Sequence, residues 1–445
     1  MKSVMIAAMH SGAGKTVMSC ALMAALKKRG LRVQAFKSGP DYIDPMFHSR
    51  VLGVESRNLD LFLQGEAGVK RSFSRASGDL ALVEGAMGYY DGINGGTDAS
   101  AWALADLLEL PTILVLRPKG SGVSLAAQVC GMRDFRRESR IAGLLLADCT
   151  DPLAAMLRPI LERECDLPVL GHLPPMEEAR IESRHLGLLT AAEVEDLTAR
   201  FDRIAETLEQ SIDLDALLYL LPDREVKPYR EERKAKRCRI AVARDEAFCF
   251  QYADNLDALQ DAGAELCFFS PLRDHALPEG VSGLYLSGGY PELHAESLAR
   301  NRSMRDAIRG ALSAGMPTVA ECGGFLYLQQ TLEDPQGVAF PMCGALPGQG
   351  FRTGKLQRFG YQTLTAETDS LLFQKGEIAP AHEFHYWDST ENGTALCSEK
   401  ADGRSWRCGY ADAQLYAAFP HLHFGGALPM ARRFVKACEV YERTE

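Results

Sequence analysis

The sequence predicts an α/β protein of two domains, each built around a parallel sheet. Its 445 residues exceed what a single hydrophobic core usually organises. In both halves, short apolar runs typical of buried strands alternate with longer segments of helical periodicity. Between the halves, residues 222–237 contain two prolines, many charged residues and few apolar ones, as interdomain linkers often do. We therefore expect one domain at 1–221, a linker at 222–237 and a second domain at 238–445.

The composition is that of a globular protein, with 46% hydrophobic and 24% charged residues. A formal net charge of −10 and the lack of a long basic run argue against nucleic acid as a partner. No apolar run reaches the roughly 18 residues of a membrane span, and the first apolar segment is too short for a signal peptide. The twelve cysteines lack the spacing of zinc or iron–sulfur ligands. These features predict a cytoplasmic protein that binds neither membrane nor nucleic acid, with most of its thiols buried.

The first domain opens with a strand, a glycine-rich loop and a helix. The apolar run Val4–Ala8 predicts the strand, and apolar periodicity predicts a helix over Val17–Lys28. The loop Met9–Thr16 matches the phosphate-binding motif GxxxxGK[ST], except that a methionine replaces the first glycine. Its small residues let backbone N–H groups face phosphate oxygens, while Lys15 and Thr16 would contact phosphate and magnesium. The predicted nucleotide-binding residues are Ser11, Gly12, Ala13, Gly14, Lys15 and Thr16.

Two acidic groups are predicted to lie near this loop. The strand Arg32–Phe36 is followed by Lys37, and Asp41 and Asp44 come a few residues later. The carboxyl ends of parallel strands hold the ligands of α/β sheets, so these residues could bind magnesium and an anionic group, or form a solvated turn. The strand at 80–83 ends at Glu84, which is well placed for a second metal contact opposite the loop.

The rest of this half continues the alternation. Apolar runs at 111–116 and 141–147 predict two further strands, and segments 99–108 and 123–132 predict helices beside them. A parallel sheet covered by helices follows from this order. The remaining elements that we expect are a helix at 154–164, a short strand at 169–170 and a helix at 191–208.

The second half repeats the pattern and adds a cysteine at a sharp turn. A strand at 318–320 leads into Glu321, Cys322 and two glycines, and an apolar helix begins at Phe325. This spacing is typical of a strand-to-helix elbow, where only small residues after the nucleophile avoid a clash. We expect the helix N-terminus to lower the pKa of the Cys322 thiol. The other expected elements are strands at 239–243, 265–269 and 283–286 and a helix at 252–262.

A cysteine nucleophile needs a base, and the stretch 419–424 offers two histidines. In a strand, His421 and His423 would share one face. A lone histidine is more often structural than catalytic. Here it accompanies an elbow and a turn at Gly288 and Gly289, whose N–H groups could form an oxyanion hole. The combination favours nucleophilic catalysis.

These motifs together resemble those of the cobyrinic acid a,c-diamide synthase family, in which a dethiobiotin-synthetase-like ATP domain precedes a class I glutamine amidotransferase domain. The resemblance covers nearly the whole chain. It implies a P-loop NTPase-like parallel sheet domain followed by a flavodoxin-like amidotransferase domain. The stretches that carry it are 11–16, 36–44, 84–92, 183–188, 288–292, 321–324, 382–386 and 421–424.

The resemblance implies an ATP- and glutamine-dependent carbon–nitrogen ligase. ATP would phosphorylate a carboxylate of a tetrapyrrole side chain, and ammonia released from glutamine would attack the acyl phosphate. Cys322 would carry the glutamine carbonyl as a thioester, with His421 as its base. Mg²⁺ is the implied cofactor, and a homodimer stays open. The implied residues are Gly288, Gly289 and Gly323 around glutamine and its oxyanion; Thr16, Asp41, Asp44 and Glu84 for the metal; and Lys37, Tyr42, Asp91, His382 and His385 for the substrate.

Three positions differ from the patterns of related proteins, one of them only from that of ordinary class I amidotransferases and two from that of the family itself. His423 occupies the place of the glutamate that follows the catalytic histidine in ordinary class I amidotransferases, which favours a Cys322/His421 dyad over a triad. Ala147 replaces an asparagine expected to read adenine, and Arg117 replaces a frequent aspartate. Adenine recognition is therefore open, and hydrogenobyrinate and nickel sirohydrochlorin stay open as substrates beside cobyrinate.

A nucleotide switch is the competing class. In partition ATPases a signature lysine stands where this chain has His10, and an inactive amidotransferase domain could accompany such a switch. A switch needs no nucleophile elbow, however. The second half of the chain therefore favours the enzyme.

Overall fold

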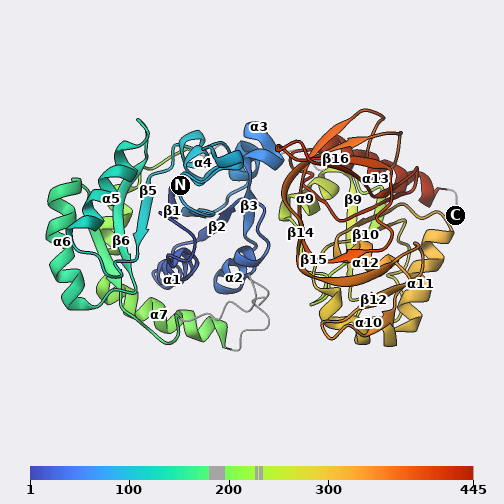
Figure 1. Cartoon of the computed structure of the whole chain (residues 1–445), viewed down its shortest axis with the longest axis horizontal. Coiled ribbons are helices and arrows are strands. Elements are labelled where there is room, and N and C mark those ends of the chain that lie inside the picture. The colour runs from blue at the N-terminus through green and yellow to red at the C-terminus, as the bar shows by residue number, and fades with distance from the viewer. Residues whose placement is uncertain (180–195, 226–228, 230–233, 444–445) are drawn as a thin grey trace. The chain divides into compact units, whose positions relative to one another are not determined.

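The computed structural model of the chain describes residues 1–179, 196–225, 229 and 234–443 (Figure 1). Within them the chain divides into two compact units. Unit 1 comprises Met1–Leu61 and Gly65–Arg230, and unit 2 comprises Phe62–Gln64 and Glu231–Glu445. Part of 222–237 and the whole stretch 183–188 lie outside the described residues, so the limits of the expected domains and linker stay predictions.

Unit 1 is built around a seven-stranded sheet of order β3-β2-β4-β1-β5-β6-β7, in which every neighbouring pair is parallel. This sheet confirms the α/β class that the alternation predicts. The strands are β1 (Lys2–Ala8), β2 (Val33–Ser38), β3 (Arg57–Leu59), β4 (Leu80–Glu84), β5 (Thr112–Leu116), β6 (Ile141–Ala147) and β7 (Val169–Leu173). The helices are α1 (Lys15–Lys28), α2 (Ile43–Leu52), α3 (Leu61–Ser74), α4 (Ala101–Leu107), α5 (Val123–Asp134), α6 (Asp151–Cys165), α7 (Leu197–Ser211) and α8 (Leu214–Leu220).

Side chains of the central strand alternate between two hydrophobic cores. In β1, Val4 and Ile6 join the core formed with α1, α2, α7 and α8, whereas Met5 and Ala7 join the core formed with α3 to α6. Helices therefore cover both faces of the sheet, as can be followed in Figure 1. Because β1 lies between β4 and β5, the loops after these three strands meet at one edge, where doubly wound sheets bind ligands.

Several elements of unit 1 differ from the sequence expectation. Helix α2 replaces the solvated turn after Lys37, and its Pro45 is tolerated because it lies in the first turn, where its missing N–H has no helical partner. The sequence expectation also lacks β3, α3 and α8. Helix α3 is broken at Gly65, which has a φ of 63°. The helix expected at 191–208 is seen as α7, while residues 191–195 lie outside the described part.

Unit 2 contains a six-stranded sheet of order β18-β19-β11-β10-β8-β9, parallel except for the edge strand β18. Helices α9 and α13 pack on one face, and α10, α11 and α12 pack on the other. The strands are β8 (Cys238–Ala243), β9 (Ala264–Phe269), β10 (Gly283–Leu286), β11 (Thr318–Glu321), β18 (Tyr410–Ala411) and β19 (Leu415–Ala418). The helices are α9 (Ala253–Ala262), α10 (Ala295–Arg300), α11 (Arg302–Ser313), α12 (Gly323–Leu328) and α13 (Leu428–Glu442).

A second, mostly antiparallel sheet of unit 2 is absent from the sequence expectation. Its order is β13-β12-β14-β15-β20, and β16 pairs with β14 and β17. Strand β14 mixes glycines with charged residues and is largely half exposed, so it lacks the apolar alternation that reveals a strand. The register of β15 and β20 places His382 opposite His421. The strands are β12 (Thr331–Glu333), β13 (Ala339–Pro341), β14 (Gln349–Ala366), β15 (Ile378–Ser389), β16 (Leu396–Glu399), β17 (Ser405–Cys408) and β20 (His421–Leu422).

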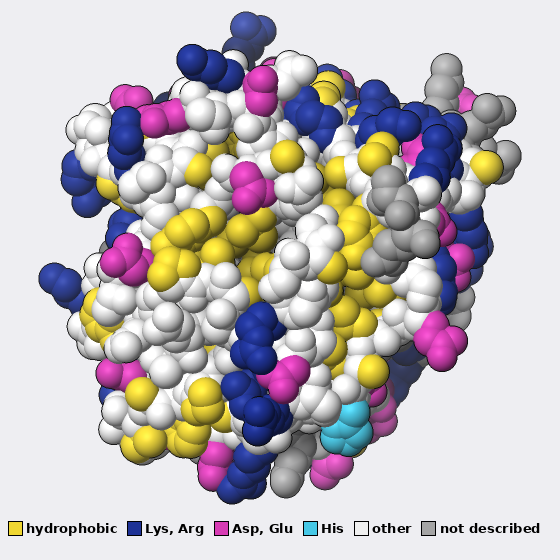
Figure 2. Space-filling view, turned by 90° about the vertical axis from the view of Figure 1, so that its right-hand side faces the viewer, with side chains coloured by type: hydrophobic (Ala, Val, Ile, Leu, Met, Phe, Trp, Pro, Cys, Tyr) yellow, Lys and Arg dark blue, Asp and Glu magenta, His cyan; other side chains and the backbone are white. Residues whose placement is uncertain are grey.

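Figure 2 shows one face of the molecule, on which charged and other polar groups interrupt the patches of hydrophobic side chains. The exposed large hydrophobic residues of unit 2 include Phe268, Val338 and Val440. Among the described residues, no helix combines the length and the apolar character needed to cross a membrane.

Candidate active site

The glycine-rich loop of unit 1 connects β1 to α1 and is open on its outer side. Gly12 and Gly14 have φ values of 77° and 90°, a backbone shape that favours glycine. A Cβ atom added to Gly12 would meet nothing within 4 Å. Lys15, which begins α1, donates hydrogen bonds from Nζ to the Met87 carbonyl at 2.6 Å and the His10 carbonyl at 3.2 Å. The loop therefore holds its lysine in place and leaves space beside Gly12.

Buried polar side chains converge beside the start of α1. Thr16 donates from Oγ1 to Oε1 of Glu84 at 2.7 Å, and Oδ1 of Asp44 lies 3.3 Å from the same hydroxyl. Lys37 bridges the two carboxylates, with Nζ 2.5 Å from Oδ2 of Asp44 and 2.9 Å from Oε1 of Glu84. His48, which the sequence analysis did not single out because its segment reads as a turn, lies 2.7 Å from Oε2 of Glu84. The structure thus brings together the predicted Thr16, Lys37, Asp44 and Glu84.

Glu84 remains ionised in this cluster although it is completely buried. Burial alone would raise the pKa of its carboxyl group, but the Lys37 ammonium and the hydrogen bond with His48 hold that pKa below its ordinary value. Hydroxyl and carboxylate oxygens are the ligands that Mg²⁺ prefers, usually together with phosphate oxygens of a nucleotide. The oxygens of Thr16, Asp44 and Glu84 fit such an ion, with Lys37 as a neighbouring positive charge.

Asp41, by contrast, caps a helix. Its Oδ1 accepts hydrogen bonds from the backbone N–H groups of Ile43 at 2.7 Å and Asp44 at 3.4 Å, at the start of α2. Of the two aspartates in the prediction, the structure therefore favours Asp44 beside Thr16. Tyr42 is half-buried just before α2, and Asp91 accepts a hydrogen bond from the backbone N–H of Gly88 at 3.0 Å. Substrate contacts by Tyr42 and Asp91 stay predictions.

Cys322 lies at the turn between β11 and α12 of unit 2. Its φ of 48° and ψ of −103° are strained for a residue with a side chain. A Cβ atom on Gly323 would lie 2.8 Å from Cδ of Pro291, and one on Gly324 would overlap the Leu286 carbonyl. This close packing confirms the predicted elbow, in which only glycine fits after the cysteine.

The base and the oxyanion turn are adjacent to this elbow. A Cβ atom on Gly288 would overlap the His421 ring, would lie 3.2 Å from its Nε2 and 3.5 Å from Cβ of Cys322. The backbone N of Gly289 would lie 3.1 Å from a Cβ on Gly323. The structure therefore brings the five residues predicted for thioester formation and oxyanion binding, namely Cys322, His421, Gly288, Gly289 and Gly323, into one buried site.

The expected low pKa of the thiol is wrong for this structure. Burial raises the pKa of Cys322, and the negative charges of Glu292 and Glu383 add to this effect. A hydrogen bond from the Gly323 N–H opposes it, but α12 has only six residues and therefore a weak dipole. Burial also lowers the pKa of His421 to about 3, with further lowering by His382 and His385. At neutral pH the resting pair is thus a neutral thiol and a neutral imidazole.

His423 has different surroundings from His421. Strand β20 contains only His421 and Leu422, so the expected alternation does not extend to His423 and the two rings need not share a strand face. The His423 ring packs on Tyr252, with ring centroids 4.6 Å apart. A Cβ on Gly425 would lie 2.8 Å from the His423 ring. This packing is that of a core side chain.

A buried polar network holds the strand that carries His421. Oε1 of Glu321 accepts a hydrogen bond from the Leu422 N–H at 2.9 Å, and Oε2 accepts one from the Tyr285 hydroxyl at 2.9 Å. Asn255 donates to the Leu422 carbonyl at 2.9 Å and accepts from the Phe424 N–H at 2.6 Å. Burial raises the pKa of Glu321 to about 7. The residue before the nucleophile therefore fixes the segment of the base, a role with no sequence motif to reveal it.

His382 and His385 lie in unit 2 on β15, near His421. Both ring nitrogens of His385 are engaged, with Glu383 at 2.6 Å and with the Trp387 carbonyl. Its ring also stacks on Phe419 at 3.9 Å between centroids. A buried imidazole with both nitrogens engaged is a poor substrate contact. The structure therefore favours a supporting role for His385, and a substrate role for His382 stays a prediction.

The models of two protein families match parts of the chain. Residues 4–189 match the CobQ/CobB/MinD/ParA nucleotide binding domain. Residues 239–428 match the CobB/CobQ-like glutamine amidotransferase domain. The first match contains the glycine-rich loop, and the second contains the cysteine elbow and His421.

Known relatives are similar along their full length. A cobyrinate a,c-diamide synthase of Clostridium acetobutylicum is 39% identical over 445 residues, which cover 98% of this chain and 100% of that protein. The enzyme of Synechococcus sp. is 40% identical, and the alignment covers 98% of this chain and 98% of that protein. The enzyme of Salmonella typhimurium is 39% identical, and the alignment covers 97% of each chain. The chain therefore belongs to the cobyrinate a,c-diamide synthase family of amidoligases.

Proposed function

We propose that this protein amidates the a and c carboxylates of a corrin or related tetrapyrrole, with ATP and glutamine as co-substrates, in cobalamin biosynthesis. One observation carries the proposal: a phosphate-binding loop and a cysteine elbow beside a histidine occur in a single chain that matches cobyrinate a,c-diamide synthases end to end. The same chemistry on hydrogenobyrinate or nickel sirohydrochlorin is the alternative. A nucleotide switch is disfavoured because a switch has no use for a strained nucleophile elbow.

The first half of the reaction activates a carboxylate. An oxygen of the substrate carboxylate attacks the γ-phosphorus of ATP, and the bond to ADP breaks, which leaves an acyl phosphate. Backbone N–H groups of 11–16 and the Lys15 ammonium would hold the phosphates in line. Thr16, Asp44 and Glu84 would hold Mg²⁺, which when bound screens the negative charge that gathers on the phosphates. Lys37 balances the two carboxylates so that the cluster tolerates an anionic ligand.

The second half releases ammonia from glutamine. His421, neutral at rest, takes the proton of the Cys322 thiol, and the sulfur attacks the side-chain amide carbon. N–H groups near Gly289 and Gly323 would stabilise the oxyanion. His421 then returns the proton to the leaving nitrogen as the carbon–nitrogen bond breaks. Water hydrolyses the thioester to glutamate. Ammonia attacks the acyl phosphate, phosphate leaves, and an amide remains.

The direct test is amidation of purified cobyrinate, hydrogenobyrinate and nickel sirohydrochlorin, each with ATP, Mg²⁺ and glutamine, read by mass spectrometry. We expect two successive exchanges of a carboxyl OH for NH₂ on one of the three acids, with ADP and glutamate formed in equal amounts. Absence of any mass change, with ATP and glutamine intact, would refute the proposal. Gel filtration decides whether the protein is a homodimer, which the sequence leaves open, and cell fractionation tests the predicted cytoplasmic location.

A further inference from the structure

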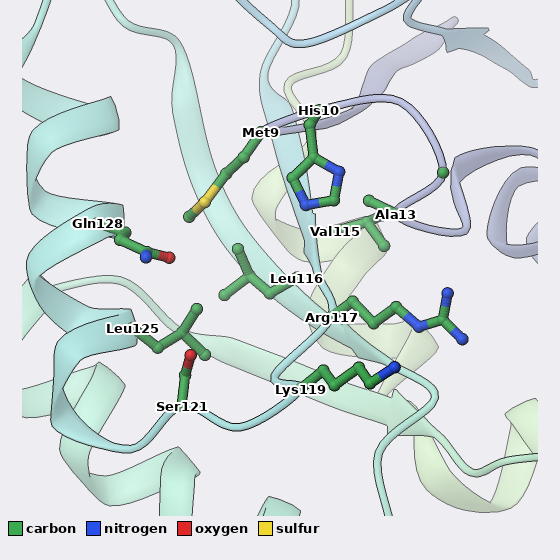
Figure 3. Close-up of a pocket in the computed structure, with 11 residues that line it drawn as sticks. Met9, His10, Ala13, Val115, Leu116, Arg117, Lys119, Ser121, Leu125 and Gln128 are labelled. Atoms are coloured by element: carbon green, nitrogen blue, oxygen red, sulfur yellow. The ribbon is translucent and has the colours of Figure 1, made fainter.

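A pocket of about 430 Å³ borders the glycine-rich loop (Figure 3). It lies by the end of β5, whereas Glu84 ends β4, and β1 lies between these two strands in the sheet. Its walls come from the loop itself and from β5 and the start of α5. Met9, Leu116 and Leu125 give it an apolar floor, and Gln128 adds an amide. All of these residues belong to unit 1.

The charged lining of this pocket is basic. Arg117 and Lys119 line it, and no aspartate or glutamate among the residues that the structure describes does so, although the chain as a whole has a net charge of −10. In Figure 3 the two side chains extend in the same direction from the loop after β5, below Ala13. On the other side of the glycine-rich loop, Asp44 and Glu84 are both acidic and buried among polar groups. The loop thus lies between a cluster that contains two acidic side chains and a pocket whose charged lining is Arg117 and Lys119.

This asymmetry matters for a substrate that carries several carboxylates. A carboxylate near Asp44 and Glu84 meets the negative charge of the ionised Glu84, which is tolerable only where Lys15, Lys37 and a metal ion offset it. The other carboxylates of the same molecule need positive partners elsewhere within reach. The basic pocket adjoins the loop that would hold the phosphates, and its apolar floor suits the hydrocarbon edge of a macrocycle.

Arg117 has capacity for such a ligand. Its Nε and one terminal nitrogen bind Oδ2 of Asp148, with Nε at 3.0 Å. A guanidinium has five N–H donors, so others remain for a second carboxylate. Both side chains of this pair are more than 40% exposed, so the ion pair is screened and is expected to be weak. A ligand carboxylate can therefore share or replace Asp148 at little cost.

We propose that this pocket binds a carboxylate-bearing arm of the substrate other than the arm being phosphorylated, with Arg117 and Lys119 as its anion contacts. The inference rests on the proposed function, because it takes a polycarboxylic tetrapyrrole as the ligand. It assigns a role to Arg117, one of the positions at which the chain departs from the family pattern. The pocket is too small for a whole macrocycle, so it sets which arm faces the phosphates.

The test compares Arg117→Ala, Lys119→Ala and their combination with the control Arg163→Ala. Arg163 is an exposed arginine of α6 that also pairs with one carboxylate, that of Glu164. Equilibrium binding of each of the three acids is followed by the absorbance of the tetrapyrrole, and ATP affinity and glutaminase rate are measured in parallel. We expect each pocket variant to weaken binding of the tetrapyrrole by about tenfold or more, as expected for loss of a hydrogen bond to a charged group. ATP affinity, the glutaminase rate and the control should stay unchanged.

Three results would overturn the proposal. Unchanged tetrapyrrole affinity in the double variant removes the pocket from the substrate site. Weaker ATP binding with unchanged tetrapyrrole binding assigns the pocket to the nucleotide instead. Binding of none of the three acids by the unmodified protein rejects the pocket together with the proposed function. If the unmodified protein binds an acid in a manner that depends on Arg117 but never amidates it, the pocket stands and the proposed function alone fails.

Discussion

Two strand-to-helix turns carry the candidate chemistry, and their glycines serve opposite purposes. At Gly12 and Gly14 of unit 1, positive φ angles shape the loop, and at Gly12 a Cβ would meet nothing within 4 Å. At Gly323 and Gly324 of unit 2, an added Cβ would collide with neighbouring atoms. The first turn leaves room for a ligand to touch the backbone. In the second, the glycines let the strained elbow of Cys322 pack tightly against Pro291 and Leu286.

Burial also acts differently in the two turns. Around Lys15, burial and the Lys37 charge lower the pKa of the ammonium to about 8, which leaves it mostly charged at neutral pH. Around Cys322 and His421, burial raises one pKa and lowers the other, so both groups are neutral at rest. A site that binds anions keeps its charge, whereas a site that creates charge during the reaction starts without it.

The largest expected effect is that of Lys15→Ala, which tests the ligand-binding turn. We expect loss of amidation with both glutamine and ammonia, since no acyl phosphate forms without a held nucleotide. Glutamine hydrolysis by unit 2 should persist as the internal control. Amidation is measured as the product amide formed over time, and glutamine hydrolysis as the glutamate formed over time. Amide formation from ammonia in this variant would remove the nucleotide from the loop.

The next effect separates the two histidines of unit 2. His421→Ala should lower the glutaminase rate by about 10²- to 10⁴-fold, as is typical for loss of a general base. His423→Ala should change it by less than about tenfold, because that ring packs on Tyr252 and is not needed to take the proton. The pH dependence of the reaction of Cys322 with a thiol reagent gives the pKa of the thiol in each variant as a second readout. Equal losses in both variants would refute His421 as the sole base.

Stability measurements compare the glycines directly. Gly324→Ala forces a methyl group onto the Leu286 carbonyl and should destabilise unit 2 by about 3 kcal/mol or more. Gly12→Ala meets no atom and should cost about 1 kcal/mol, from its left-handed φ alone. Calorimetric unfolding, with the transitions of the two units assigned separately, gives both values. A larger loss in Gly12→Ala would contradict the distinction between open and packed turns.

The smallest effect is a pH dependence of nucleotide binding. Anion binding needs the Lys15 ammonium, whose lowered pKa of about 8 means that it loses its proton as pH rises through that value. Affinity for ATP should therefore be constant below pH 7 and fall about tenfold for each unit above pH 8. Isothermal titration calorimetry from pH 6 to pH 9.5 measures it. Lys15→Arg provides the control, because an arginine stays charged throughout and should flatten the profile.

Sequence patterns reveal features that depend on neighbours along the chain. The strand–loop–helix units at Lys15 and Cys322 are predictable, because glycine spacing and apolar runs define them locally. Glu84 is predictable as an acidic residue at the end of a strand, and His421 as one of two histidines that could serve the cysteine elbow. The network of Glu321, Tyr285 and Asn255 is not, because contacts between residues as distant as 36 to 169 positions create it.

The sign of the thiol pKa shift illustrates the same limit. A cysteine before a helix predicts a low pKa, but the shift depends on how deeply the thiol is buried and on acids from other segments, including Glu292 and Glu383. Strand β14 likewise has no clear pattern, because most of its residues are neither fully buried nor arranged in a regular alternation. Helix α2 could not be predicted from the sequence, because Pro45 is compatible with the first turn of a helix as well as with a loop.

The most direct test of the two-site account is the variant Cys322→Ala, assayed on the preferred tetrapyrrole with ATP and either glutamine or ammonium chloride. The thioester is needed only to release nitrogen from glutamine. The account therefore predicts no amide from glutamine and, at saturating ammonium chloride near pH 8, amide formation at the rate of the unmodified protein. Loss of activity with both nitrogen sources in a variant that still binds ATP and tetrapyrrole normally would contradict it.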